Sequence, residues 1–199
     1  MSNLSYGKAL DDLLKPLGFT RDRNNWARTR GDMLEVVNLQ VSAIAGVTAN
    51  LQMHDRETAR IVSEIPSKEP LFLIIPSMRI GELIDGYDRW WKKDPKGPTE
   101  LSEAVRRHGL PYFDRVRTLE EQAAHWYGRG SQKGWHGQSL IGLAVTLYRM
   151  GQVEEACAEL SRPTPKTAIP SSVAGVQSVR QWLGCDGPEV GPSQKPSQS

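Results

Sequence analysis

The spacing of apolar residues changes after the first seventeen or so positions of the chain. Before that point apolar side chains recur three and four residues apart, at Tyr6, Leu10, Leu13, Leu14 and Leu17. This spacing places them on one face of a helix, and Pro16 and Gly18 favour the end of the helix there. From Asn24 onward the spacing shortens to two, which is typical of strands. We therefore expect an N-terminal helix that covers one face of a sheet.

Three consecutive antiparallel strands are predicted by this alternation. They cover residues 24–30, 33–41 and 47–54, and the third shows the clearest alternation of apolar and polar side chains. Gly31-Asp32 supplies two residues that tolerate the first hairpin turn, and residues 42–46 form the second connection.

The turn at Gly31-Asp32 fixes the register of the first two strands. It places Arg28 opposite Glu35 and Trp26 opposite Val37, which gives a charge pair and an aromatic to β-branched pair. The pairs expected between the second and third strands are Val41–Val47, Leu39–Ala49 and Val37–Leu51. A slip of one residue would mix polar with apolar side chains, so the pattern favours this register.

The same register predicts one apolar face against the helix and one polar face. The side chains expected on this polar face are Asn38, Gln40, Thr48, Asn50, Gln52 and His54. Asparagine and glutamine are depleted in strands, and burying them without partners is costly. The polar face is therefore either plainly exposed to solvent or a recognition surface for a partner.

Beyond the third strand the pattern predicts short strands and then helices. Short strands are expected at 71–75, bounded by prolines as at a sheet edge, and at 78–80 and 88–93. Helices are expected at 99–109, from 118, over 140–150, 153–160 and 172–183. Thr118 and Glu121 have the spacing of a capping box, and the glycine-rich stretch 128–137 is predicted to be a loop.

These elements together predict an α+β fold. The N-terminal helix packs on an antiparallel sheet of four to six strands, and a helical C-terminal region follows. The expected divisions are an α+β domain over 1–95, the helical region over 96–183 and a disordered tail over 184–199, which is rich in Gly, Pro and Ser.

The composition is that of an ordinary globular protein. The chain has 199 residues, 38% of them hydrophobic and 24% charged, with a net charge of +2, which excludes a collagen, a coiled coil and a mostly disordered chain. No apolar run approaches the roughly 18–20 residues that cross a bilayer, and the first residues lack the pattern of a secretory signal. We expect a cytoplasmic protein. Cys157 and Cys185 have no paired spacing, so neither a disulfide framework nor a zinc knuckle is expected.

The sequence offers little positive evidence of catalysis. Phosphate-binding, acyl-hydrolase and zincin motifs are absent from it. The four histidines, His54, His108, His125 and His136, have no mate at metal-ligand spacing. We expect no metal or cofactor and favour a protein without enzymatic activity. The alternative is a small enzyme of unknown reaction that uses His54 near Asn38 and Gln52, in a deep pocket.

Two adjacent tryptophans offer a second candidate contact. Trp90 and Trp91 alternate on a predicted strand, so one faces the core and the other is exposed beside Arg89, as in a protein-binding anchor. Basic residues suggest nucleic-acid binding as a third possibility, through Lys92, Lys93, Arg106 and Arg107. The small net charge argues against nucleic acid as a partner.

Several motifs in a fixed order resemble a known family. They are residues 14–19 (LKPLGF), the Trp26 strand before Gly31-Asp32, residues 36–40 (VVNLQ), 79–83 (RIGEL), 89–91 (RWW) and 110–114 (LPYFD). The chain is similar in these to the bacterial family catalogued as domain of unknown function 4304. The resemblance implies no catalytic residues, and it implies an interaction or immunity-type role by analogy. Residues 43–46 (AIAG) depart from the more polar residues expected there, so the partner surface differs.

A second resemblance concerns residues 144–160 alone. Their sequence is similar to the turn between two helices of a tetratricopeptide unit. One such unit does not bury its own apolar face, so we expect a helical hairpin that packs on the rest of the protein.

The leading hypothesis is a non-enzymatic bacterial protein that binds another protein, of immunity type or regulatory. The residues expected to contact the partner are Asn38, Gln40, Asn50, Gln52, His54, Trp90 and Trp91.

Overall fold

The computed structural model describes residues 5–67, 71, 75–133, 137–163 and 170–186. The chain divides into two compact units. Unit 1 comprises residues 1–56 and 75–117, and unit 2 comprises residues 57–74 and 118–199. Each unit is described by itself below.

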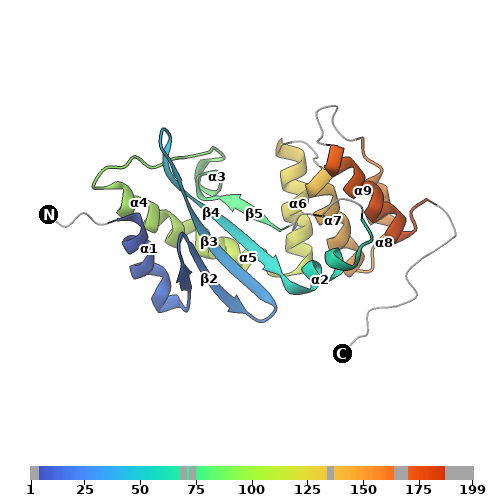
Figure 1. The fold of residues 1–199 in the computed structure, drawn as a ribbon, viewed down its shortest axis with the longest axis horizontal. Coiled ribbons are helices and arrows are strands. Elements are labelled where there is room, and N and C mark those ends of the chain that lie inside the picture. The colour runs from blue at the N-terminus through green and yellow to red at the C-terminus, as the bar shows by residue number, and fades with distance from the viewer. Residues whose placement is uncertain (1–4, 68–70, 72–74, 134–136, 164–169, 187–199) are drawn as a thin grey trace. The chain divides into compact units, whose positions relative to one another are not determined.

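Unit 1 contains a five-stranded antiparallel sheet in the order β1-β2-β3-β4-β5 (Figure 1). Its strands are β1 (Thr20–Asp22), β2 (Asn25–Arg30), β3 (Met33–Ser42), β4 (Gly46–Asp55) and β5 (Ser77–Arg79). Its α-helices are α1 (Tyr6–Leu14), α3 (Ile80–Asp85), α4 (Gly97–Ala104) and α5 (Leu110–Arg115). A 3-10 turn over Lys15–Leu17 follows α1, and a π-helical turn over Val105–Gly109 joins α4 to α5. The predicted α+β fold, with its N-terminal helix and antiparallel sheet, is confirmed.

The predicted strand registers are also confirmed. Arg28 pairs with Glu35 and Trp26 with Val37 across β2 and β3. The pairs between β3 and β4 are Val41–Val47, Leu39–Ala49 and Val37–Leu51, as the alternation predicts. Leu39 and Leu51 are consequently buried, and Asn38 and Asn50 lie on the opposite face of the sheet.

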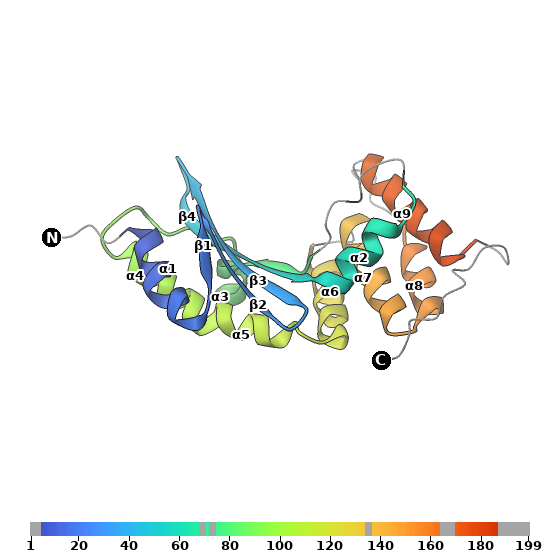
Figure 2. The ribbon, with the colours of Figure 1, turned by 60° about the horizontal axis from the view of Figure 1, so that its bottom comes forward.

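The core of unit 1 lies between the apolar face of the sheet and the helices (Figure 2). Leu10 and Leu14 of α1, Leu101 of α4 and Phe113 of α5 are all buried in one cluster with the strand residues. Burial of a large apolar side chain contributes about 1.5–3 kcal/mol, so this cluster holds the helices to one face. The helices that the structure describes in this unit leave the polar face of the sheet uncovered.

Ionic contacts are built into the same apolar face. Glu35 is fully buried, and its carboxylate accepts hydrogen bonds from Arg28 (2.7 Å) and Arg30 (2.5 Å). Arg30 also pairs with Asp114 of α5 at 2.8 Å, and the Arg28 guanidinium lies 4.5 Å from the centroid of Phe19. Two arginines of the adjacent strand, Arg28 and Arg30, therefore balance the buried negative charge of Glu35.

Some predicted elements of unit 1 differ from the structure. The expected strand at 88–93 is wrong, since Trp91 forms one isolated bridge with Val47 and no ladder extends from it. The strand expected at 78–80 lies at Ser77–Arg79, and Ile80 begins α3 instead. The helix expected to end at Gly109 continues through the π-helical turn into α5. A Cβ at Gly109 would lie 3.3 Å from a Leu51 methyl group, so glycine lets this turn pack closely on the sheet. Most of the strand expected at 71–75 lies outside the described residues.

Unit 2 is helical. Its helices are α2 (Arg56–Glu64), α6 (Leu119–Lys133), α7 (Gly137–Arg149), α8 (Val153–Leu160) and α9 (Pro170–Leu183). The capping box of Thr118 and Glu121 is present, with 3.3 Å between each backbone nitrogen and the other side chain. The loop predicted over 128–137 is wrong at 128–133, where α6 runs on to Lys133, and at Gly137, where α7 begins. Residues 134–136 lie outside the described residues. Burial of Ala123 and Trp126 on the same helix offsets the low helix propensity of Gly128.

The expected helical hairpin is formed by α7 and α8. Gly151 adopts a left-handed conformation, with φ of 78°, and the backbone nitrogen of Gln152 donates to the carbonyl of Leu147 at 2.9 Å. The hairpin packs with α2 and α9 in the core of unit 2. The region therefore buries its apolar faces within one group of helices.

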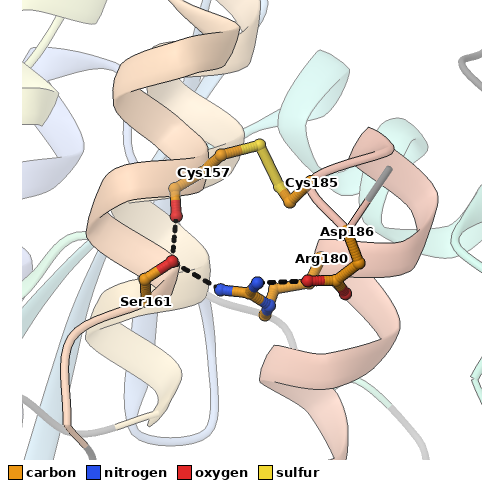
Figure 3. Close-up of a disulfide and its surroundings, with 5 residues drawn as sticks. All are labelled: Cys157, Ser161, Arg180, Cys185 and Asp186. Atoms are coloured by element: carbon orange, nitrogen blue, oxygen red, sulfur yellow. Dashed lines mark hydrogen bonds and ion pairs between the residues drawn. A yellow bond between two sulfur atoms is a disulfide. The ribbon is translucent and has the colours of Figure 1, made fainter. Parts of the chain in front are cut away.

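A disulfide joins Cys157 of α8 to Cys185, just after α9 (Figure 3). The expectation that the cysteines form no disulfide is therefore wrong, because the packing of α8 against α9 brings together residues 28 positions apart. Arg180 reinforces this junction by donating to Ser161 Oγ at 2.6 Å and pairing with Asp186. Ser161 Oγ in turn donates to the carbonyl of Cys157 at 2.8 Å.

The predicted domain boundaries stay predictions. The structure groups α4 and α5 with the sheet in unit 1, and it places residues 57–74 in unit 2. Residues 187–199 of the expected tail lie outside the described residues. No helix in the described ranges has the length and apolar character that crossing a membrane requires.

Candidate functional site

A row of polar residues crosses four strands on the uncovered face of the sheet. Asn25 of β2 pairs with Asn38 of β3, Asn38 with Asn50 of β4, and Asn50 with Arg79 of β5. Residues directly opposite each other in antiparallel strands share a face, so all four side chains lie on the polar face.

The asparagines of this row are linked by hydrogen bonds. Asn50 Nδ2 donates to Asn38 Oδ1 at 3.1 Å, and Asn38 Nδ2 donates to Asn25 Oδ1 at 2.7 Å. Asn50 Nδ2 also donates to Gln40 Oε1 at 3.1 Å. Each link fixes the orientation of the next amide, so the network presents its donors and acceptors in a set pattern. Asn38, Gln40 and Asn50 are half-buried and therefore reach solvent as well.

Arg79 connects this network to Trp90. Its guanidinium donates to Gln40 Oε1 at 3.4 Å, pairs with the carboxylate of Asp88, and lies 5.4 Å from the centroid of the Trp90 ring. Trp90 is half-buried, whereas Trp91 is only 6% exposed and belongs to the core of unit 1. Trp90 is therefore the tryptophan that offers an aromatic surface beside the amides.

Thr48 departs from the expected polar surface. The alternation predicts Thr48 on the polar face with the amides, and its pairing with Gln40 places it there, but its side chain is fully buried. The reason is that the segment after α3 returns along β4, and Thr48 Oγ1 donates to the carbonyl of Arg89 at 3.0 Å. This segment covers one end of the polar face and leaves the amides beyond it accessible.

Gln52 and His54 extend the polar face along β4. Both are half-buried, and neither side chain forms a hydrogen bond with a residue that the structure describes. Their cross-strand partners on β3 are Val36 and Leu34. Burial lowers the pKa of His54 below its ordinary value, which favours the neutral imidazole. This end of the face therefore combines free polar groups with aliphatic neighbours.

Sequence reasoning missed two members of the site. Asn25 immediately precedes Trp26, so extending the predicted register by one pair would have placed it opposite Asn38. Arg79 had no such signal, because its position depends on β5 pairing with β4 over only three residues.

The described residues offer little support for metal binding or for phosphate contacts. Within those ranges, no group of three or more His, Cys, Asp or Glu residues is placed to hold a metal ion. Arg106 and Arg107, candidates for phosphate contacts, both pair with the carboxylate of Glu103. These ion pairs hold the pKa of Glu103 at about 2, chiefly through the hydrogen bond from Arg106.

The fold and this surface define a class of protein: an α+β domain whose antiparallel sheet carries helices on one face and an ordered amide network on the other. Residues 10–115 match the family Domain of unknown function (DUF4304), and the chain belongs to this family. The match begins before β1 and ends two residues before the end of unit 1, well beyond β5, so it includes the whole sheet. No curated protein and no solved structure matches the chain.

Proposed function

We propose that the protein is a non-enzymatic bacterial protein-binding module, of immunity type or regulatory, that acts in the cytoplasm. Its partner would lie on the polar face and contact Trp90. The observation that carries this proposal is the linked row Asn25–Asn38–Asn50, on a face that the described helices of unit 1 do not cover.

The arrangement suits recognition of a polypeptide for two reasons. The network fixes the amides before binding, so little rotamer entropy is lost when a partner binds. Gln52 and His54 keep free hydrogen-bonding groups, and Trp90 adds an aromatic contact held by Arg79. Aromatic residues with such support contribute a large share of binding energy at interfaces.

The experiment compares partner recovery from lysate of the native host by the tagged wild-type protein and the double variant Gln52→Ala/Trp90→Ala. Gln52 makes no internal hydrogen bond within the described residues, so the variant is expected to stay folded, which circular dichroism checks. Recovery of the partner should fall about ten-fold, equivalent to about 1.4 kcal/mol.

The matched control is Gln177→Ala/Gln181→Ala, which removes two exposed amides from α9 in unit 2. It should recover the partner like the wild type. Equal recovery by the wild type and the Gln52→Ala/Trp90→Ala variant would remove the polar face from the proposal. The alternative of a small enzyme at His54 stays an untested prediction.

A further inference from the structure

The tip of the hairpin between β3 and β4 carries exposed apolar side chains. Ile44 is 99% exposed and Val41 is 54% exposed, and Ala43 and Ala45 are exposed between and beside them. Ser42 Oγ accepts hydrogen bonds from the backbone nitrogens of Ile44 (3.3 Å) and Ala45 (3.0 Å). The turn is therefore locally ordered, and it holds these aliphatic groups in solvent. Single exposed apolar residues are ordinary, but a run at one projecting tip marks a contact surface.

The neck of this hairpin is joined to the segment that follows Trp90. Val47 and Trp91 exchange two backbone hydrogen bonds, of 2.9 and 2.8 Å. Gly46 has φ of +113°, and a Cβ there would lie 2.3 Å from the Trp91 carbonyl oxygen and 3.8 Å from Lys92 Cα. Only glycine permits so close an approach with this backbone conformation. Lys92 is consequently held beside the hairpin.

This segment carries unpaired positive charge. Lys92, Lys93 and Lys96 are exposed, and none forms an ion pair with a residue in the described ranges. The nearby Arg79 and Arg89, by contrast, pair with Asp88 and Asp85. The one acidic side chain among residues 91–97, Asp94, accepts hydrogen bonds from the backbone nitrogens of Lys96 and Gly97.

We propose that the apolar tip and these three lysines form a docking surface for an acidic protein with an apolar pocket that receives Ile44. This inference rests on the proposed function and names the chemistry of the partner. A buried aliphatic anchor supplies affinity, and rim lysines steer an oppositely charged partner and select against basic ones. The tip carries no aromatic residue, and interfacial membrane anchors commonly use aromatic residues, so the observations favour a protein over a lipid surface.

The experiment places the photo-crosslinking residue p-benzoylphenylalanine at position 44, in the full chain within cells of the native host. The matched control carries the same probe in place of Val173, an exposed apolar residue of α9 in unit 2. We expect a crosslink to one polypeptide from position 44 and none from position 173. The crosslinked peptide, identified by mass spectrometry, should lie in an acidic region of that polypeptide.

Charge variants then decide the role of the lysines. Lys92→Glu/Lys93→Glu/Lys96→Glu should lower the crosslink yield about ten-fold or more, while the corresponding triple change to arginine keeps it. All three side chains are exposed, so the melting temperatures should match that of the wild type, and this is measured. Each of four results would overturn the inference. They are a crosslink yield unchanged by charge reversal, a crosslink to lipid, a crosslinked region that is basic, and no crosslink from position 44.

A third probe position separates this inference from the proposed function. This variant carries p-benzoylphenylalanine in place of Gln52. If position 52 crosslinks to a partner and position 44 does not, the proposed function stands and the docking surface at the hairpin tip is ruled out. Failure at both positions would count against both proposals.

Discussion

Asn50 Nδ2 donates a hydrogen bond to Asn38 Oδ1 across β3 and β4, over 3.1 Å. The same nitrogen also donates to Gln40 Oε1, and Asn38 Nδ2 donates in turn to Asn25 Oδ1. Asn50 is thus the donor on which the organisation of the polar face depends. Its strand neighbour Gln52 lies on the same face and takes no part in the network.

The contrast between these two residues gives the first prediction. Asn50→Ala removes two hydrogen bonds. It leaves the half-buried Asn38 Oδ1 to water, and Gln40 Oε1 keeps only the donor from Arg79, so the free energy of unfolding should fall by about 1–2 kcal/mol. Gln52→Ala should change it by no more than about 0.5 kcal/mol. Urea unfolding followed by circular dichroism measures both. Equal effects of the two substitutions would show that the network contributes nothing to stability.

The buried carboxylate of Glu35 gives a second prediction. Glu35→Ala leaves the guanidinium groups of Arg28 and Arg30 without their shared partner, although Arg30 keeps Asp114. Breaking a buried ion pair on one side costs about 3–5 kcal/mol, and the partial exposure of the arginines places the expected loss near the lower end. Denaturant unfolding measures it.

An exposed pair supplies the comparison for that result. Asp12 pairs with Lys8 on the surface of α1, and both side chains are about 60% exposed. Asp12→Ala should lower the free energy of unfolding by no more than about 1 kcal/mol. Similar losses for both acidic residues would mean that burial of Glu35 carries no special cost.

The sequence predicted the sheet well, because strand register follows from local signals. One turn at Gly31-Asp32 and the alternation of side chains were enough to place Glu35 beside Arg28 and to gather the amides on one face. The family resemblance came from the same region, and the family match covers it.

The remaining features depend on packing between distant segments. Thr48 is buried because residues near Arg89 return over β4, and no local pattern encodes that path. The disulfide needs α8 and the end of α9 to meet, and a separation of 28 residues resembles no cysteine motif. The exposed tip at Ile44 showed itself in the sequence only as a departure from the family pattern.

The disulfide provides a third prediction. Chain-entropy arguments assign about 3–4 kcal/mol to a cross-link that closes a loop of this length. Cys157→Ser/Cys185→Ser should therefore lower the melting temperature of the helical unit, and a dithiol reductant should lower the wild type to the same value. The reductant should leave the variant unchanged.

The same cysteines bear on the expected cytoplasmic location. A reducing cytoplasm would keep both thiols free, whereas the structure joins them. Alkylating cells before lysis and counting labelled cysteines by mass spectrometry tests this. Two labelled cysteines would agree with the predicted location, and no label on either would argue against it.

Asp11 gives the last prediction, which concerns acid stability. Burial opposes the ionisation of Asp11, but hydrogen bonds from Lys15, Trp26 and Arg21 outweigh it and hold the pKa below its ordinary value of 3.8. The donor–acceptor distances are 3.0, 2.7 and 3.2 Å. As the pH falls below about 4, the Asp11 carboxylate binds a proton in the unfolded chain but stays ionised in the folded protein.

The stability that Asp11 contributes is therefore complete above its ordinary pKa and is lost as the pH falls through the lowered pKa of the folded protein. Asp11→Asn should be less stable than the wild type near pH 6, and the difference should shrink towards about pH 2–3. Lys15→Met, which removes one exposed donor, should show a smaller effect of the same sign. Urea unfolding across this pH range measures the free energy of unfolding of the wild type and of each variant. A difference between wild type and Asp11→Asn that stays constant with pH would contradict a lowered pKa of Asp11.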